Sequence, residues 1–262
     1  MTTSIDCDYT ISGSGPPLFM VHGIGARRST WDGLAEYLRN DFTCIAYDLR
    51  GHGETPSSAL PFGLDELVAD LEALRSKLGI EKAAVIGHSL GGMIGPAYAR
   101  AYPNRVAALG LLSTAAFRTA DDSSKVKGVL KAMEDTSVEA MLDTLVNRWF
   151  TDEFQARHPE KVANRKRQII ETPLQVFLNV FHIYAETEMS PWLHEIEARS
   201  LVMTGELDGG CSPRLNEQIA HSLRNSELVV LKGLKHNILI EAPQRVAPPV
   251  LRFMKTHSST GA

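Results

Sequence analysis

Cysteine is scarce in this chain of 262 residues, and its distribution excludes two kinds of cross-linked domain. Cys7, Cys44 and Cys211 are odd in number, and none belongs to a C-x-x-C pair. They therefore fit neither a disulfide framework nor a four-thiolate zinc site. Free thiols are typical of a reducing compartment, so we expect a cytoplasmic protein.

Positive charge is not in excess either, because 27 Lys and Arg stand against 31 Asp and Glu, a formal net charge of -4. The electrostatic attraction that nucleic-acid binders use is missing, and we expect no nucleic-acid partner. No run of about 18 consecutive apolar residues occurs, and the first residues contain no basic stretch leading into an apolar run. We therefore expect neither a membrane-spanning helix nor a signal peptide.

The common cofactor and metal motifs are also missing. The sequence contains no G-x-x-x-x-G-K-[ST] phosphate loop and no H-E-x-x-H zinc motif. Gly23-Ile24-Gly25 begins like a dinucleotide-binding G-x-G-x-x-G, but Arg28 occupies the position of the third glycine. We expect no cofactor and no metal ion.

What the sequence does contain is an alternation of short apolar runs with stretches of helical periodicity. This pattern predicts a parallel sheet covered by helices on both faces. The clearest helix is 64–78, with leucines along one face and Gly79 at its end. The predicted strands are 17–21, 43–47, 83–86, 106–112, 200–204 and 227–231.

Between about residues 115 and 196 the strand-like runs disappear. Charged residues are frequent there, and helical periodicity runs through 129–134, 138–150 and 173–185. We interpret this segment as an insertion. The predicted organisation is a core domain of residues 1–115 and 196–262 with a helical cap of residues 116–195.

Ser89 lies at the centre of the sequence Gly87-His88-Ser89-Leu90-Gly91, directly between a predicted strand and a predicted helix. A sharp strand-to-helix turn leaves no room for a Cβ atom two positions before or after the serine, so glycine is required there. The helix N-terminus beneath such a turn favours negative charge. Ser89 is the candidate nucleophile.

A serine hydroxyl needs a base to remove its proton, and the base needs an acid to hold it. Asp208 follows a predicted strand in a glycine-flanked turn, and His236 follows the last predicted strand. This order of serine, acid and histidine along the chain is that of a hydrolase triad. Glu206 is the alternative acid, and we prefer Asp208.

An acyl-transfer site also needs two N–H donors for the oxyanion of its tetrahedral intermediate. The backbone N–H of Leu90, immediately after the serine, is one candidate. The other is the N–H of Ile24 in the turn that follows the first predicted buried strand.

Together these motifs resemble the α/β-hydrolase superfamily over nearly the whole chain. The resemblance implies an eight-stranded, mostly parallel sheet with a helical cap inserted after the sixth strand. It also implies a catalytic Ser89, Asp208 and His236. The motifs that carry it are 22–25, 47–53, 87–92, 205–208 and His236.

Residues 148–154 and 233–236 are similar to 3-oxoadipate enol-lactonases and related ring-fission-product hydrolases of aromatic catabolism. A serine at position 89, in place of an aspartate, argues against the haloalkane dehalogenases and epoxide hydrolases of this fold. The resulting hypothesis is a cofactor-independent serine hydrolase of a small ester or lactone, including a carboxylate-bearing enol-lactone.

Two alternatives stay open: hydrolysis of a C–C bond or an amide in a ring-fission product, and a ligand-binding receptor with the same fold. Arg27 and Arg28 are candidates for an anionic substrate group, although surface arginines fit equally well. Trp149, Phe181 and Trp192 are candidates for an apolar pocket or for packing within the cap. The basic residues of 157–167 are typical of a solvated helix face. We expect a monomer or a homodimer.

Overall fold

The central sheet has seven strands in the order β1-β3-β2-β4-β5-β6-β7, and β1 alone runs antiparallel to its neighbour. The computed structural model describes residues 3–57 and 61–258. The predicted mostly parallel α/β sheet is confirmed. The strands are β1 (Tyr9–Ser12), β2 (Pro17–Val21), β3 (Thr43–Tyr47), β4 (Ala83–His88), β5 (Val106–Leu112), β6 (Arg199–Gly205) and β7 (Ser226–Leu231).

The predicted number of eight strands is wrong, because the described residues form seven. Before β1 the backbone is bonded to side chains instead of to a strand: the N–H of Ile5 donates to Asp70, and that of Asp8 donates to Thr55. The helical insertion accordingly follows the fifth strand, β5. β1 itself was not predicted, since three of its four residues are exposed and leave no apolar run.

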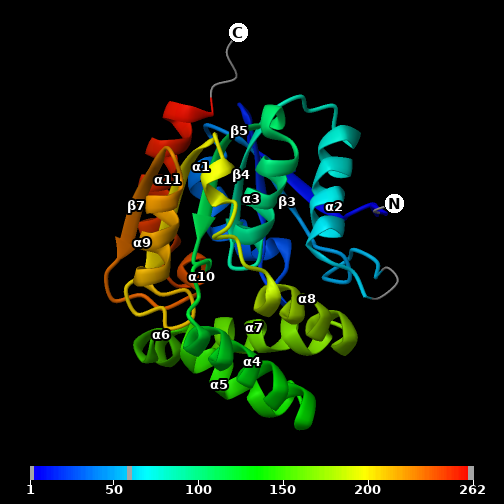
Figure 1. The fold of residues 1–262 in the computed structure, drawn as a ribbon, viewed down its shortest axis with the longest axis vertical. Coiled ribbons are helices and arrows are strands. Elements are labelled where there is room, and N and C mark those ends of the chain that lie inside the picture. The colour runs from blue at the N-terminus through cyan, green and yellow to red at the C-terminus, as the bar shows by residue number, and fades with distance from the viewer. Residues whose placement is uncertain (1–2, 58–60, 259–262) are drawn as a thin grey trace.

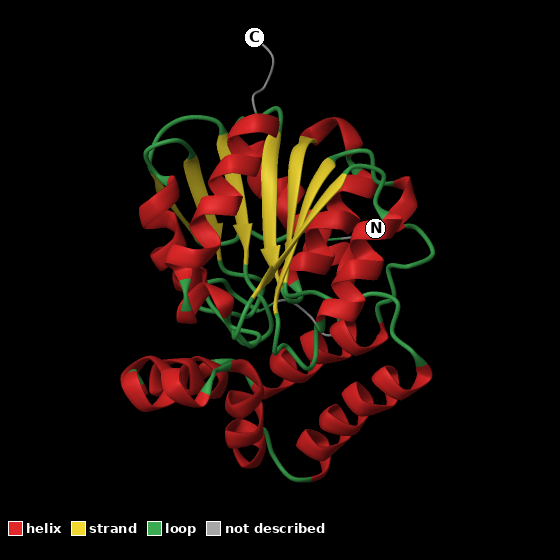
Figure 2. Ribbon diagram, turned by 90° about the vertical axis from the view of Figure 1, so that its left-hand side faces the viewer, coloured by secondary structure: helices red, strands yellow, loops and turns green. Residues whose placement is uncertain are grey.

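Alternating residues of the strands divide the core into two layers. Phe19 and Val21 face one cluster of buried side chains, and Leu18 and Met20 face the other. The first cluster includes side chains of α2 (Leu64–Lys77), α3 (Gly91–Ala101) and α9 (Pro213–Ser222). The second includes side chains of α1 (Asp32–Leu38) and α11 (Pro243–His257). Figure 2 shows the sheet between these helices.

A separate group of helices lies across the carboxyl ends of the strands, at the bottom of Figures 1 and 2. We call it the helical layer. It consists of α4 (Ala120–Asp135), α5 (Leu142–Trp149), α6 (Asp152–Arg157), α7 (Pro159–Glu171) and α8 (Leu174–Glu186). The bounds of α6 and α7 were not predicted, although the basic residues of 157–167 indicated a helix face, because charged residues obscure the apolar face of both helices. The sequence does contain a start signal for each helix: Thr151 caps the N-terminus of α6, and Pro159 lies in the first turn of α7.

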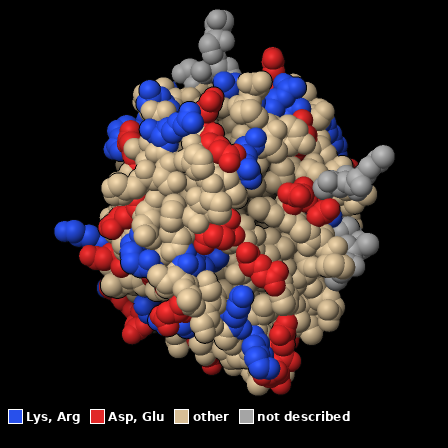
Figure 3. All heavy atoms as spheres, in the orientation of Figure 1, with Lys and Arg blue, Asp and Glu red and all other residues tan. Residues whose placement is uncertain are grey.

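The remaining helices are short, and the surface is mixed in charge. On the face drawn in Figure 3, basic and acidic side chains are interspersed. No helix among the described residues combines the length and the apolar character needed to cross a membrane. The short elements are α10 (Ile238–Glu241) and the 3-10 helices η1 (Arg28–Trp31), η2 (Pro103–Arg105), η3 (Glu139–Met141) and η4 (Leu193–Glu195).

The strand order determines where a ligand can enter. β2 and β4 are neighbours in the sheet, but the chain leaves β2 toward one edge and β4 toward the other. Loops that diverge in this way open a crevice at the carboxyl ends of the two strands, which is the usual ligand position in such sheets. The turn containing Ile24 follows β2 and the turn containing Ser89 follows β4, so both border this crevice.

Candidate active site

Ser89 occupies a strained turn between β4 and α3. Its φ is 57°, in the left-handed region that residues with a Cβ rarely adopt. The turn is possible because its flanking glycines lack side chains: a Cβ on Gly87 would lie 1.9 Å from the carbonyl oxygen of Gly91, and one on Gly91 would lie 2.1 Å from that of Val21. The serine N–H donates to the carbonyl of Leu112 at 2.9 Å. The surrounding backbone therefore fixes the position of Ser89 in this turn.

Asp208 and His236 come together although 27 residues separate them, and the imidazole Nδ1 lies 2.8 Å from Asp208 Oδ2. A carboxylate can only accept, so Nδ1 carries the proton and Nε2 is left for another partner. The other oxygen, Asp208 Oδ1, accepts from the N–H groups of Gly210 and Cys211 at 3.0 and 2.8 Å. Glu206, the alternative acid, instead accepts from the N–H of Gly233.

The shared hydrogen bond shifts the pKa values of both partners. Burial alone would lower the pKa of His236, but the Asp208 carboxylate opposes this and raises it above its ordinary value of 6.5. Burial would likewise raise the pKa of Asp208, yet His236 and the two backbone donors hold it below its ordinary value. The pair thus favours an anionic aspartate next to a basic imidazole.

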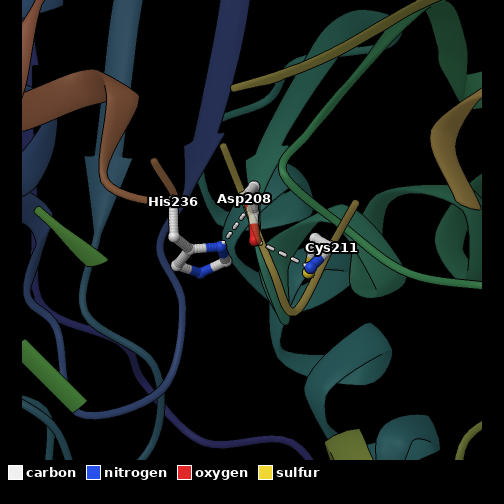
Figure 4. A group of neighbouring side chains, drawn as sticks. All are labelled: Asp208, Cys211 and His236. Atoms are coloured by element: carbon white, nitrogen blue, oxygen red, sulfur yellow. Dashed lines mark hydrogen bonds and ion pairs between the residues drawn. The ribbon is translucent and has the colours of Figure 1, made fainter. Parts of the chain in front are cut away.

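Asp208, Cys211 and His236 also have the composition of a metal site, with their ligand atoms within 4.8 Å of one another (Figure 4). Two ligands of a tetrahedral zinc ion are roughly 3.3 Å apart, because each lies about 2.0 to 2.1 Å from the metal. The 2.8 Å between Nδ1 and Oδ2 is shorter and is that of a hydrogen bond. Cys211 contributes its N–H to Asp208, and its sulfur lies 3.3 Å from the Tyr184 hydroxyl. The grouping therefore fits a hydrogen-bonded pair better than a metal centre.

His88 lies beside Ser89 and holds the loop that carries His236. Burial, together with the nearby His236, lowers the pKa of His88 to about 3, so its ring is neutral at neutral pH. Its Nε2 lies 2.9 Å from the carbonyl oxygen of His236, which requires the proton on Nε2. His88 also lines the cavity described below.

The turn after β2 is fixed by two buried histidines. Burial lowers the pKa of His22 to about 4 and that of His52 to about 3, so both rings stay neutral. His22 Nδ1 donates to the carbonyl of Gly23 at 2.8 Å, and His52 Nε2 accepts from the N–H of Gly25 at 3.1 Å. Within residues 3–57 and 61–258, the N–H groups of Ile24 and Leu90 have no hydrogen-bond acceptor. Ile24 lines the cavity described below, whereas Leu90, the residue after Ser89, is fully buried and is not among the lining residues.

A cavity of about 100 Å³ lies at the boundary between the sheet and the helical layer. Ser89, Asp208 and His236 all line it, together with Ile24. Its apolar wall comes mainly from the helical layer and consists of Val126, Val129, Leu145, Trp149, Phe181 and the ring of Tyr184. The size and lining favour a small, partly apolar ligand.

The residues predicted to bind substrate divide into two groups. Trp149 and Phe181 line the cavity. Arg27 and Arg28 do not: Arg27 pairs with Glu171 at 2.5 Å, and Arg28 pairs with Asp8 at 2.7 Å and also with Asp48. Trp192 also lies outside the lining and stacks against the Arg100 guanidinium at 5.3 Å. Both arginines are thus paired with acidic residues that do not line the cavity.

Several lining residues were not predicted. Arg165 was interpreted as part of a solvated face, but it is only 5% exposed. Its spacing from Val162 and Ile169 places it on the apolar face of α7, a signal that the sequence does contain. Thr30 and Asn237 also line the cavity, and among the described residues Thr30 Oγ1 and Asn237 Nδ2 are buried without a partner.

Comparison with known proteins finds a matching family model and several hydrolases that are similar to this chain. Residues 16–243 match the family model described as the alpha/beta hydrolase fold. The chain is 26% identical to 3-oxoadipate enol-lactonase 2 of Acinetobacter baylyi, over 92% of this chain and 89% of that one. It is 23% identical to the (E)-2-((N-methylformamido)methylene)succinate hydrolase of the same organism, over 95% and 94%. A thermophilic esterase from Thermogutta terrifontis, solved with malate bound, superposes with a TM-score of 0.86 at 25% identity, covering 95% and 93%.

Proposed function

Because the chain belongs to the alpha/beta hydrolase fold family, we propose that it is a serine hydrolase that cleaves a small carboxylic ester or lactone through an acyl-enzyme on Ser89. The observation that carries the proposal is the 2.8 Å hydrogen bond between His236 Nδ1 and Asp208, in the same cavity as a serine in a strained turn. Few arrangements other than nucleophilic catalysis require these three groups together.

In this mechanism Ser89 Oγ attacks the carbonyl carbon while His236 Nε2 takes the hydroxyl proton. Asp208 holds the imidazole and stabilises its positive charge. The N–H groups of Ile24 and Leu90 bind the oxyanion of the tetrahedral intermediate. The proton then passes from His236 to the leaving oxygen. Water attacks the acyl-enzyme, again with His236 as base, which releases the acid and restores Ser89.

The proposed substrate is small and carries a carboxylate, as an enol-lactone does. Arg148 lines the cavity and adds positive charge, and Thr30 and Asn237 add hydrogen-bonding groups. Similarity to an enol-lactonase supports the lactone. Residues 116–195 are proposed as a cap over a core of residues 1–115 and 196–262, in a cytoplasmic monomer or homodimer that needs no cofactor.

Hydrolysis of an amide in a ring-fission product is the second candidate. It is favoured by the similarity to the (E)-2-((N-methylformamido)methylene)succinate hydrolase, whose substrate carries an amide nitrogen and two carboxylates. The same acyl-enzyme chemistry serves both reactions, because only the leaving atom differs. C–C bond cleavage would need, in addition, protonation of a carbon leaving group.

A panel of lactones, enol-lactones, aryl esters, amides and ring-fission dienes tests the proposal through kcat/KM for each compound. We expect the highest value for a small lactone or ester, and loss of turnover in Ser89→Ala. That variant should fold, because the substitution removes a single oxygen atom from a side chain that is 8% exposed. Full activity in Ser89→Ala would end the proposal.

The receptor alternative is separated from an enzyme by counting turnovers. An enzyme converts many equivalents of at least one compound in the panel, whereas a receptor releases at most one equivalent of product. Reaction of Ser89 with a fluorophosphonate does not make this distinction, because it reports only an activated nucleophile. Single-equivalent release with every compound would favour the receptor.

A further inference from the structure

Arg165 reaches from helix α7 of the helical layer into the turn after β2. Its guanidinium donates to the carbonyl of Ile24 at 2.8 Å and to the carbonyl of Gly25. The same group lies over the ring of Trp149, 4.8 Å from its centre. The two contacts with carbonyls cross the boundary between the helical layer and the sheet, and one of them is with Ile24, the residue whose N–H is proposed to bind the oxyanion.

The burial of this arginine is not balanced by an acid. Among the described residues no carboxylate oxygen lies within 4.0 Å of the Arg165 guanidinium. By contrast, Arg50, which is also buried, pairs with Asp70 at 2.7 Å. Burial lowers the pKa of Arg165 to about 9. A buried charge without a counterion is costly, so a purely structural role would be served better by an apolar side chain. A buried arginine without an acidic partner is therefore expected to serve function more than stability.

The other polar groups of the turn show what Arg165 adds. The carbonyl of Gly23 accepts from His22 Nδ1 and from the N–H of Ala26, and the N–H of Gly25 donates to His52. The two carbonyls that follow, those of Ile24 and Gly25, are held by Arg165. The Ile24 N–H lies in the same peptide plane as the Gly23 carbonyl, and Arg165 holds the two peptide planes that follow it. Together these contacts give the whole turn, and with it the Ile24 N–H, a defined direction.

We propose that Arg165 is a positioning residue that holds the oxyanion turn in its active geometry, so that this turn is complete only when the helical layer is seated on the sheet. The proposal rests on the function proposed above. Without Arg165 the turn relaxes and the Ile24 N–H no longer points at the oxyanion. The ground-state carbonyl carries little negative charge, so the loss falls on the transition state and appears in kcat.

The test compares Arg165→Met and Arg165→Lys with the wild type, using the best ester or lactone of the panel. The matched control is Arg167→Met, on the same helix, where the side chain is 67% exposed and contacts Asn164 and Glu171 of that helix. We expect kcat to fall about 10- to 100-fold in Arg165→Met with KM within about twofold. Lysine keeps the charge but cannot hold both carbonyls, so Arg165→Lys should lose less. Arg167→Met should match the wild type.

A boronic acid that forms a tetrahedral adduct on serine supplies a readout that general loosening would not move. We expect its affinity for Arg165→Met to fall by the same factor as kcat, while a ground-state product analogue binds unchanged. A raised KM with unchanged kcat would overturn the positioning role and indicate substrate binding instead. If Arg165→Met fails to fold, Arg165→Lys decides: wild-type kcat and boronate affinity overturn the proposal, and a parallel loss supports it.

Failure of this inference is distinguishable from failure of the proposed function. If Ser89→Ala stays active, the acyl-enzyme itself is wrong, whatever Arg165 does. If Ser89→Ala is inactive and Arg165→Met retains wild-type kcat, only the positioning role is wrong.

Discussion

The sheet and the helical layer build two sides of one cavity by different means. From the sheet come Ser89, Asp208, His236 and the oxyanion turn, all in loops that follow strands. The helical layer supplies side chains, such as Trp149, that project from amphipathic helices. On the sheet side, function depends on the conformation of the backbone in the loops. In the helical layer, it depends on which side chains face the cavity. Substitutions in the two regions should therefore fail in different ways.

The largest effect is expected on the sheet side, in Asp208→Asn. Asparagine keeps an oxygen for the N–H groups of Gly210 and Cys211, but it can no longer stabilise the imidazolium or enforce the proton on Nδ1. We expect kcat to fall about 10⁴-fold with little change in thermal stability. Steady-state kinetics and a melting curve measure both quantities.

The matched control is Glu206→Gln, because Glu206 lies two residues away and contacts the N–H of Gly233. Its kcat should stay within about threefold of the wild type, as is usual for an exposed substitution away from the reaction. The assignment of the acid would be wrong if Glu206→Gln lost activity and Asp208→Asn kept it.

A pair of glycines sharpens the contrast in backbone constraint. Alanine at Gly91 would place a Cβ 2.1 Å from the carbonyl oxygen of Val21, so β2 or the serine turn must move. We expect the free energy of unfolding to fall by about 3 kcal/mol. Gly128, in α4 of the helical layer, has no heavy atom within 4 Å of such a Cβ. Gly128→Ala should raise stability by about 0.5 to 1 kcal/mol.

Urea denaturation of both variants measures these differences. Equal stability of Gly91→Ala and the wild type would show that the turn tolerates a side chain. Lack of space around the backbone would then not distinguish the sheet side of the site from the helical layer.

The pH profile tests the electrostatics of the site. His236 acts as a base only when neutral, and Asp208 raises its pKa above 6.5. Activity should therefore be lost as the pH falls through this raised value, which puts the acid limb of kcat/KM above pH 6.5. A midpoint of the acid limb below pH 6, or a kcat/KM that does not change between pH 5 and 8, would contradict this assignment.

The smallest effect is expected in the wall of the cavity. Phe181→Leu keeps an apolar side chain but removes contact area, so KM should rise by up to about tenfold with kcat within about threefold. Ile170→Ala is the control, because Ile170 is 53% exposed in the same layer. A large fall in kcat in Phe181→Leu, with KM unchanged, would mean that this wall also positions the reacting groups.

What could be predicted from the sequence follows the same division. Ser89, Asp208 and His236 each follow a predicted strand, and the carboxyl ends of parallel strands share one edge of the sheet. Their arrival in one cavity could be inferred from local patterns and chain order. β1 was not predicted, because it is four residues long and mostly exposed and so has no apolar run.

The helical layer could not be predicted in the same detail. A charged residue such as Arg165 is normally solvated, and only packing against the turn after β2 shows that it is buried. Arg27 and Arg28 lie next to that turn in the sequence, but their contacts with Glu171 and Asp48 are between distant segments. Side-chain direction in both cases is decided by tertiary contacts.

Mass spectrometry of the acid-quenched protein, mixed with an excess of an activated ester, tests the nucleophile most directly. We expect one acyl group per chain, mapped to the peptide that contains Ser89, and none on Ser89→Ala. Acylation of another residue during turnover, or rapid turnover by the alanine variant, would contradict the account.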